Sequence, residues 1–196
     1  MNLEQKVDLC FHIRGRFLDV DHGFALYGAI SRILPIIHED EEIGVKLISG
    51  NYIGNGRLDI APYSKLVIRL PASKIRKYIN LAGRTLTLGS DKVFVGTPNT
   101  RMLQSTSELY AHLVTTRNGQ EQERFEREIQ NQMGKFEIHS GLKVGKRRTF
   151  QVHGKQVVGF SVFLSELTEH ESIMMQERGL GGRRKMGCGF FEALKR

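Results

Sequence analysis

Apolar residues change their spacing along the first half of the chain, and this change restricts the fold more than any other feature. In residues 6–14, "KVDLCFHIR", they alternate with polar residues, which is the period of a half-buried strand. Leu26 and Ile30 then follow at helical spacing, with Asp21 available to cap the helix and Pro35 to end it. A strand followed by a helix is therefore predicted at the start of the chain.

Strand patterns and helix patterns continue to follow one another as far as residue 95. A helix over Pro71–Leu81 has proline at its first position and Gly83 just beyond its end, as is typical of helix boundaries. Short strands are predicted at Val45–Ile48, Lys65–Leu70, Thr85–Leu88 and Lys92–Val95. The order β-α-β-β-α-β is the split pattern of a ferredoxin-like sheet with its helices on one face.

The second half has a similar but less regular order. A strand is predicted at Leu109–Arg117, a charged helix at Gln120–Met133 and an apolar strand in the stretch "KQVVGFSVFLSEL". Thr168 and Glu171 match a capping box that opens a short helix, with Gly179 expected just past its end.

The polar segment 96–107 contains glycine, proline, asparagine and serine but no apolar period, so it marks a boundary between the halves. We expect an α+β protein with two ferredoxin-like, RRM-like domains, residues 1–96 and 108–196, joined by a linker at 97–107. Cys10 and Cys188 are too few for a disulfide framework or a multi-cysteine zinc site, and both are expected to be reduced.

The charge of the chain indicates a polyanionic partner. A net charge of +8 favours nucleic acid first and an anionic membrane second. No stretch has the length of a membrane-spanning helix, and the first residues lack the apolar segment of a signal peptide. We therefore expect a cytoplasmic protein without a membrane partner.

A glycine-rich stretch near the end of the chain, "ERGLGGRRKMGCGFF", combines five glycines with three consecutive basic residues. Repeated glycines let a main chain approach a ligand and expose its N–H groups, and the neighbouring cations suit phosphates. The stretch lacks the ending of a Walker loop, and it follows a helix rather than a strand, unlike a dinucleotide fingerprint. The alternative interpretation is a flexible, solvated basic turn.

This stretch also resembles the C-terminal glycine-rich loop of the RAMP superfamily, in particular that of the CRISPR-associated endoribonucleases that process precursor CRISPR RNA. The segments "DHGFALYGAISRILPIIHED" and "YSKLVIRLPASKI" are similar to further parts of these enzymes. The resemblance covers most of the chain and implies two ferredoxin-like halves, in agreement with the element order. It also implies CRISPR repeat RNA or the crRNA hairpin as a partner, Cascade-like effector subunits as further partners, and no cofactor.

RNA cleavage without a metal uses the neighbouring 2′-hydroxyl as nucleophile and leaves a 2′,3′-cyclic phosphate and a 5′-hydroxyl. Histidine suits both proton transfers because its pKa lies near working pH. The chain has seven histidines, and the resemblance implies that His38, just past the first helix, is the catalytic one. His22, at the start of that helix, is the main rival.

Partners for His38 follow less directly. Some relatives have a tyrosine at the position of Tyr27, but a straight helix would place it about 16 Å from His38 along the axis, so only a chain reversal after Pro35 would join them. Lys46 resembles the position of a helper lysine in some members of the family. Ser31 and Arg32 are further candidates on the helix.

The acidic residues after His38 suggest a metal alternative, because Asp40 and Glu42 would suit a hard cation such as Mg²⁺ or Mn²⁺. No second acidic cluster completes a two-metal site, so a solvated loop is the preferred interpretation and a metal-independent reaction is predicted.

Candidate RNA-binding residues gather in three places. The stretch "GLKVGKRRTFQVHGK" reads as a basic hairpin suited to a stem-loop, although a merely solubilising hairpin is the alternative. Its candidates, together with those of the glycine loop at 179–189 and of the first half, are Lys143, Lys146, Arg147, Arg148, Gly179, Gly181, Gly182, Arg183, Arg184, Lys185, Gly187, Gly189, Arg32 and His12.

Two functions from different classes follow. The first is a metal-independent endoribonuclease that cuts precursor CRISPR RNA and stays bound to the product hairpin. The second is a non-catalytic RNA-binding scaffold subunit of a CRISPR effector complex, which would keep the glycine loop but would not depend on His38. A generic basic RNA-binding domain is a third interpretation, and the glycine motif argues against it.

Overall fold

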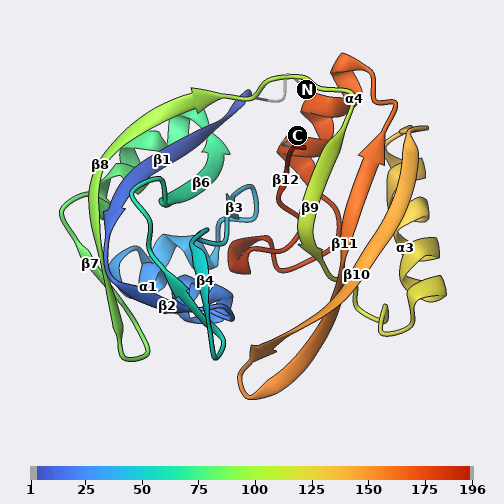
Figure 1. Cartoon of the computed structure of the whole chain (residues 1–196). Helices are drawn as coiled ribbons and strands as arrows, with labels where there is room; N and C mark the ends of the chain where they lie inside the picture. Colours follow the sequence, from blue (N-terminus) through green and yellow to red (C-terminus); the bar gives the residue numbers. More distant parts are fainter. Residues whose placement is uncertain (1–3, 195–196) are drawn as a thin grey trace. The chain divides into compact units, whose positions relative to one another are not determined.

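The computed structural model describes residues 4–194, which form two compact units that divide between Met102 and Leu103 (Figure 1). They are called unit 1 and unit 2 in chain order. The predicted linker at 97–107 differs from this division. Its first half belongs to strand β8 (Asp91–Met102), because residues 98–102 pair with β1 (Lys6–Arg14). The polar side chains that suggested a linker therefore lie on an exposed strand.

Unit 1 contains the predicted β-α-β-β-α-β order. Its sheet has the strand order β3-β6-β1-β8-β7, which without the edge strand β7 is the ferredoxin-like order. The elements besides β1 and β8 are α1 (Gly23–Ile33), η1 (Pro35–His38), β3 (Gly44–Val45), β6 (Lys65–Pro71), η2 (Ala72–Lys74), α2 (Ile75–Tyr78), η3 (Ile79–Leu81) and β7 (Thr85–Leu88).

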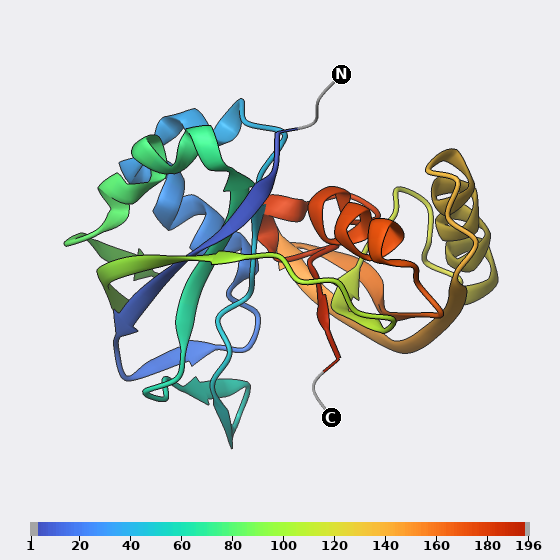
Figure 2. The same cartoon turned by 90° about the horizontal axis from the view of Figure 1, so that it is seen from above.

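The two faces of this sheet differ, as the alternation in β1 predicts. Leu9 and Phe11 lie in one core with Leu26 and Ile30 of α1 and Tyr78 of α2. Figure 2 shows both helices on the same face of the sheet.

The opposite face holds a buried ion pair. The Nε atom of Arg69 lies 2.7 Å from Oδ1 of Asp8, and each side chain is no more than 2% exposed. The guanidinium of Arg101 donates to Oδ2 of the same carboxylate at 2.8 Å.

Three local predictions for unit 1 need correction. The N-cap of α1 is His22 rather than Asp21, and it makes no side-chain capping bond. The strand predicted at Val45–Ile48 is reduced to Gly44–Val45, and the helix predicted at Pro71–Leu81 is broken into three short helical segments. These differences reflect tertiary pairing, which local propensity does not contain.

Unit 1 also contains a small sheet that the sequence patterns missed. It has the order β2-β5-β4 and is built from Phe17–Asp19, Arg57–Asp59 and Asn51–Gly54. Arg57 connects it to the main sheet, because its guanidinium lies 2.6 Å from carboxylate oxygens of both Asp19 and Asp91.

Unit 2 has the same topology as unit 1. Its elements are β9 (Leu109–Val114), α3 (Gln122–Lys135), β10 (Gly141–Val152), β11 (Lys155–Ser165), α4 (Glu169–Arg178), η4 (Arg184–Met186) and β12 (Phe191–Ala193). The sheet order is β10-β11-β9-β12, again the ferredoxin-like order. The structure thus confirms the predicted tandem ferredoxin-like fold.

Local signals in unit 2 were accurate. Phe125, Ile129 and Met133 of α3 are buried, as their spacing predicts. The capping box of Thr168 and Glu171 is present. The glycine-rich loop follows α4, and among residues 4–194 no helix is long and apolar enough to span a membrane.

Candidate active site

Tyr27 and His38 are in direct contact. The phenol oxygen of Tyr27 lies 2.6 Å from Nδ1 of His38, and the two rings meet edge to face with a centroid distance of 5.4 Å. His38 is exposed, whereas Tyr27 is partly buried against the core of unit 1. The pair therefore presents a positioned imidazole at the surface, which is what proton transfer to a bound substrate requires.

The contact results from how α1 ends. The last residue of α1 is Ile33, and Leu34 closes the helix by donating its N–H to the carbonyl of Ile30. Pro35 then begins the 3-10 turn η1. Ile37, in the same turn, is fully buried in the core of unit 1. Because Ile37 fixes this turn against the core, the next residue, His38, is returned to the side of Tyr27.

His22, the rival candidate, is a buried structural residue. Its Nδ1 atom lies 2.8 Å from the carbonyl oxygen of Asp19, and its Nε2 atom accepts the N–H of Ile48 at 2.9 Å. This pattern defines the neutral tautomer with the proton on Nδ1. Burial lowers the pKa of His22, and backbone hydrogen bonds oppose the effect only partly. Both ring nitrogens are thus engaged within the fold.

Lys46 follows β3 at the edge of the sheet, where its N–H donates to the carbonyl of Val67. Val67 is paired with Cys10. Burial raises the pKa of the Cys10 thiol, and the charge of Lys46 is among those that oppose this rise. The charge of Lys46 therefore acts on the Cys10 thiol across strand β6.

Ser31 and Arg32, the other candidates on α1, form hydrogen bonds with carbonyl groups of the main chain. The Ser31 hydroxyl donates to the carbonyl of Gly28 at 3.0 Å. Arg32 donates to the carbonyl of Thr87 at 2.7 Å and so fastens α1 to β7. Arg32 is exposed, so this bond leaves its charge at the surface.

Two of the acidic residues after His38, Asp40 and Glu42, are bound by a lysine of the protein. Lys74 donates to Asp40 at 2.7 Å and to Glu42 at 2.5 Å, and the Tyr78 hydroxyl donates to Asp40 at 3.1 Å. Burial opposes ionisation of Asp40, but these hydrogen bonds outweigh it and lower the pKa. Within residues 4–194, no group of three or more His, Cys, Asp or Glu side chains gathers as metal ligands would. The sequence pattern did not predict this network, because Lys74 and Tyr78 are distant in the chain.

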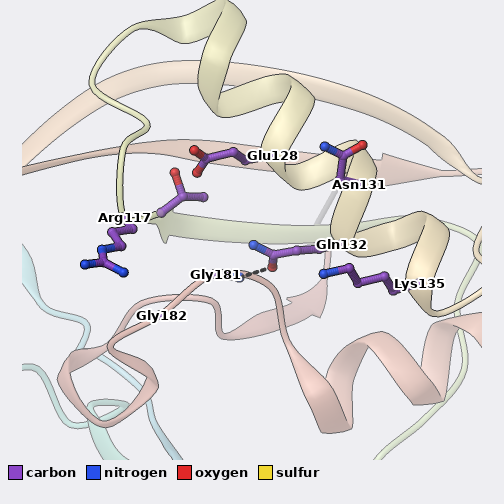
Figure 3. A pocket seen from close by; sticks show the side chains of 8 residues that line it. Arg117, Glu128, Asn131, Gln132, Lys135, Gly181 and Gly182 are labelled. Atoms are coloured by element: carbon purple, nitrogen blue, oxygen red, sulfur yellow. Dashed lines mark hydrogen bonds between the residues drawn. The ribbon is translucent and has the colours of Figure 1, made fainter.

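The amides of the glycine-rich loop differ from the exposed arrangement expected from the sequence. Gly182 and Gly189 donate their N–H groups to the carbonyls of Thr115 and Leu113, at 2.9 and 2.8 Å. The N–H of Gly181 donates to the side-chain oxygen of Gln132 on α3 at 2.8 Å (Figure 3). These bonds fix the loop to β9 and α3.

Close packing explains why glycine occupies these positions. Gly181 has φ +75°, and a Cβ atom there would overlap the carbonyl oxygen of Thr115. Gly179 and Gly189 also have positive φ, and a Cβ on either would strike the carbonyl of Gly189 or Leu180, respectively. Gly187 has φ +88° and is buried. Gly182 alone in this set has φ outside the left-handed region and open space around it.

The basic residues of the loop are not equivalent. Arg183 is exposed and adopts the left-handed conformation, with φ +57°. Arg184 donates to the carbonyl of Glu177 at 2.8 Å and so closes the end of α4. Lys185 is partly buried. Arg183 is therefore the loop cation best placed for a ligand.

A pocket of about 470 Å³ lies between the loop and α3 (Figure 3). In Figure 3 the side chain of Lys135 extends from α3 toward Gly181. The pocket is lined by Thr116, Arg117, Glu128, Asn131, Gln132, Lys135, Gly181 and Gly182.

The basic hairpin is formed by β10 and β11. Their register shifts between Val144 and Arg147, so the strand bulges there. Lys143, Lys146 and Arg147 are exposed, whereas Arg148 is partly buried. Burial lowers the pKa of His112, and the charge of Arg148 lowers it further. Bulges commonly redirect side chains at functional sites.

Two consecutive ferredoxin-like units with a glycine-rich loop after the last helix make up the fold of this chain. The family model described as "Cas6 Crispr" matches residues 7–196, and the chain belongs to this family.

Individual relatives agree with this assignment. The CRISPR-associated endonuclease Cas6 of Myxococcus xanthus (strain DK1622) is 34% identical over 198 residues, covering 97% of this chain and 82% of the relative. A solved structure of a CRISPR associated protein Cas6 has a TM-score of 0.67 at 12% identity, covering 98% of this chain and all of the other. The structure titled "An RAMP protein binding different RNA substrates" has a TM-score of 0.68 at 12% identity, covering 97% and 100%. At these identities the two structures show the fold.

Proposed function

We propose that the protein is an endoribonuclease that binds CRISPR repeat RNA and cuts precursor CRISPR RNA without a metal ion. The observation that carries this proposal is the hydrogen bond between Tyr27 and His38 at an exposed position of unit 1. The 34% identical relative is named an endonuclease, and one structural neighbour is titled as a protein that binds RNA. Both names agree with the proposal.

We assign the reaction to attack by the 2′-hydroxyl on the neighbouring phosphorus. The hydroxyl loses its proton, the bond from phosphorus to the 5′-oxygen breaks, and that oxygen takes up a proton. The products are a 2′,3′-cyclic phosphate and a 5′-hydroxyl. This chemistry needs proton transfer and charge stabilisation, both of which side chains supply.

The hydrogen bond with Tyr27 supports a role for His38 as the general acid. We infer that the imidazolium form acts, with Nδ1–H donating to the phenol oxygen of Tyr27 and Nε2–H left for the substrate. The Nε2 proton passes to the departing 5′-oxygen, and His38 becomes the neutral imidazole. Lys46 is the candidate cation that stabilises the charge on the phosphate.

RNA is held, in this proposal, by the exposed cations of the hairpin and of the glycine loop, chiefly Lys146, Arg147 and Arg183. The product hairpin stays bound, and the protein serves as a subunit of a Cascade-like effector complex. We place this activity in the cytoplasm.

A cleavage assay tests the enzyme proposal. A labelled repeat hairpin is incubated in EDTA with the wild type, with His38→Ala and with His170→Ala, whose exposed histidine lies in unit 2. We expect His38→Ala to lose cutting but keep binding, and His170→Ala to match the wild type. Binding without cutting by the wild type would instead identify a non-catalytic scaffold.

A modified substrate tests the role of His38. Sulfur in place of the bridging 5′-oxygen leaves without protonation, so a general acid is no longer needed. We therefore expect this substrate to restore cutting by His38→Ala to nearly the wild-type rate. A persistent defect would assign His38 to the removal of the 2′-hydroxyl proton.

A further inference from the structure

A second pocket, of about 590 Å³, lies on unit 1, where strands β1 and β8 slip in register between Phe11 and Ile13. Its volume is in the range of small-molecule sites. Its lining residues are His12, Ile13, Arg14, Pro62, Ala82, Gly83, Phe94, Gly96 and Thr97. None of the proposed catalytic residues is among them.

An exposed aromatic ring marks this pocket. Phe94 is 40% exposed, whereas its strand neighbours Val93 and Val95 are fully buried in the core. Because side chains alternate along a strand, Phe94 lies on the sheet face opposite the helices. Its cross-strand partner there is Arg14. A phenylalanine ring left open beside an arginine is a surface for a flat, anionic ligand.

The charges around Phe94 have one sign. His12 and Arg14 are exposed and line the pocket, and none of its lining residues is acidic. Lys65 is paired with His12 in the sheet register. Within residues 4–194, neither the His12 nor the Arg14 side chain forms a hydrogen bond or ion pair with the protein. The guanidinium of Arg14 is thus available to a phosphate, and the His12 ring to a hydrogen bond.

We propose that this pocket binds an unpaired nucleotide of the RNA substrate, with the base stacked on Phe94 and the phosphate held by Arg14. The inference rests on the proposed function for its ligand. Single-stranded RNA is recognised by stacking on aromatic side chains and by cations along the backbone. Stacking tolerates any base, and the pocket therefore selects single-stranded character rather than sequence. The occupant is the unpaired flank of the repeat hairpin.

Affinity measurements test the proposal with two RNAs, the repeat hairpin alone and the hairpin with its single-stranded flanks. They are made in the His38→Ala background, so that cutting does not affect binding. We expect Phe94→Ala to weaken binding of the flanked RNA by about tenfold, from the loss of one stacked base. Binding of the bare hairpin is expected to be unchanged, and Phe94→Tyr to bind like the parent protein.

The control variant is Ile79→Ala, which removes a side chain of similar exposure, 42%, outside the pocket. It is expected to bind both RNAs normally. An equal effect of Phe94→Ala on the two RNAs, or none on either, would overturn the inference. An acidic peptide as the true occupant would give the second result.

The outcome is separable from that of the proposed function. If wild-type protein binds the RNA but does not cut it, the endonuclease proposal fails while the stacking comparison still stands. Photocrosslinking with a 4-thiouridine in the flank gives a direct readout. The crosslinked peptide is expected to contain Phe94, and a crosslink confined to unit 2 would contradict the proposed site.

Discussion

Tyr27 and His38 are eleven positions apart in the chain, yet the phenol oxygen of one lies 2.6 Å from the imidazole of the other. Along a continuous helix the two would be separated by about 16 Å. The chain reversal at Pro35 removes this separation. The pair is thus a tertiary contact within a single helix-turn unit. His38 is exposed, whereas the ring of Tyr27 packs against the core, so a variant at Tyr27 has to keep the ring.

Replacing Tyr27 with phenylalanine removes only the hydroxyl. We expect the single-turnover cleavage rate to fall by roughly ten- to a hundredfold, because the imidazole loses the bond that sets its orientation. RNA affinity is expected to stay within about twofold. Because the residues act as one unit, adding Tyr27→Phe to His38→Ala should slow the reaction little further. An additive loss would assign Tyr27 an independent role.

The order of strands and helices was predicted well from the sequence, because each element has its own local pattern of apolar residues. The spacing of Phe125 and Ile129 is local, and the structure confirms the buried stripe that it predicts. The alternation in β1 is local too and correctly predicts a strand, but the strand is not half-buried as expected, because Asp8 and Cys10 on its polar face are also buried. The small sheet β2-β5-β4 was missed, because strands of three or four residues carry too little periodicity.

The sequence predicted which residues are candidates for the site, but not which of them are in contact. Whether His38 meets Tyr27 depends on the burial of Ile37, a tertiary effect that spacing does not contain. Likewise, the glycines suggested open amides, but the acceptor of the Gly182 N–H is Thr115, in a distant part of the sequence. The glycines indicate that the backbone of the loop lies close to another group. Only the fold shows that this group is the protein's own main chain.

His22 makes a prediction about stability. His22→Leu leaves the N–H of Ile48 without its acceptor, and we expect a loss of ~1–3 kcal/mol of unfolding free energy at pH 7.5. Since the folded state depresses the pKa of His22, the unfolded chain binds more protons below the ordinary histidine pKa of 6.5.

The stability supplied by His22 is therefore full above pH 6.5 and declines as the pH falls toward its lower, folded-state pKa. Urea unfolding of both proteins between pH 7.5 and about 5 measures this effect. The difference between wild type and His22→Leu should narrow toward low pH. A constant difference would mean that His22 is not buried as a neutral imidazole.

The buried pair of Asp8 and Arg69 makes a second prediction about stability. Asp8→Leu leaves the guanidinium of Arg69 buried without its carboxylate, and we expect a loss of about 3–5 kcal/mol. Adding Arg69→Met removes the buried charge, so the double variant should be more stable than Asp8→Leu alone. Chemical unfolding of the wild type and of both variants tests this, and a double variant that is less stable still would contradict it.

The hairpin cations are expected to contribute unequally to RNA binding. Lys146 and Arg147 are exposed, whereas Arg148 is partly buried. Removing one cation that binds a phosphate should reduce the slope of log K against log salt concentration by about 0.9. Joint replacement of Lys146 and Arg147 by alanine should therefore flatten the slope by about 2, and Arg148→Ala by less than 1. Affinities measured between 50 and 200 mM salt, roughly the range over which such effects are large, decide this. Equal slopes for all variants would remove the hairpin from the RNA interface.

Gly181 and Gly182 form a matched pair for testing how the glycine-rich loop is built. An alanine at Gly181 meets the Thr115 carbonyl at a positive φ, whereas an alanine at Gly182 meets open space. We expect Gly181→Ala to lower the unfolding free energy by at least ~1 kcal/mol, and Gly182→Ala to change it by less than ~0.5 kcal/mol. Thermal unfolding measures both.

Because the N–H groups of both glycines donate within the protein, Gly182→Ala should also bind the repeat hairpin normally. A stable Gly182→Ala variant with weakened RNA binding would show instead that the loop backbone contacts the RNA at this residue, as the sequence pattern suggested.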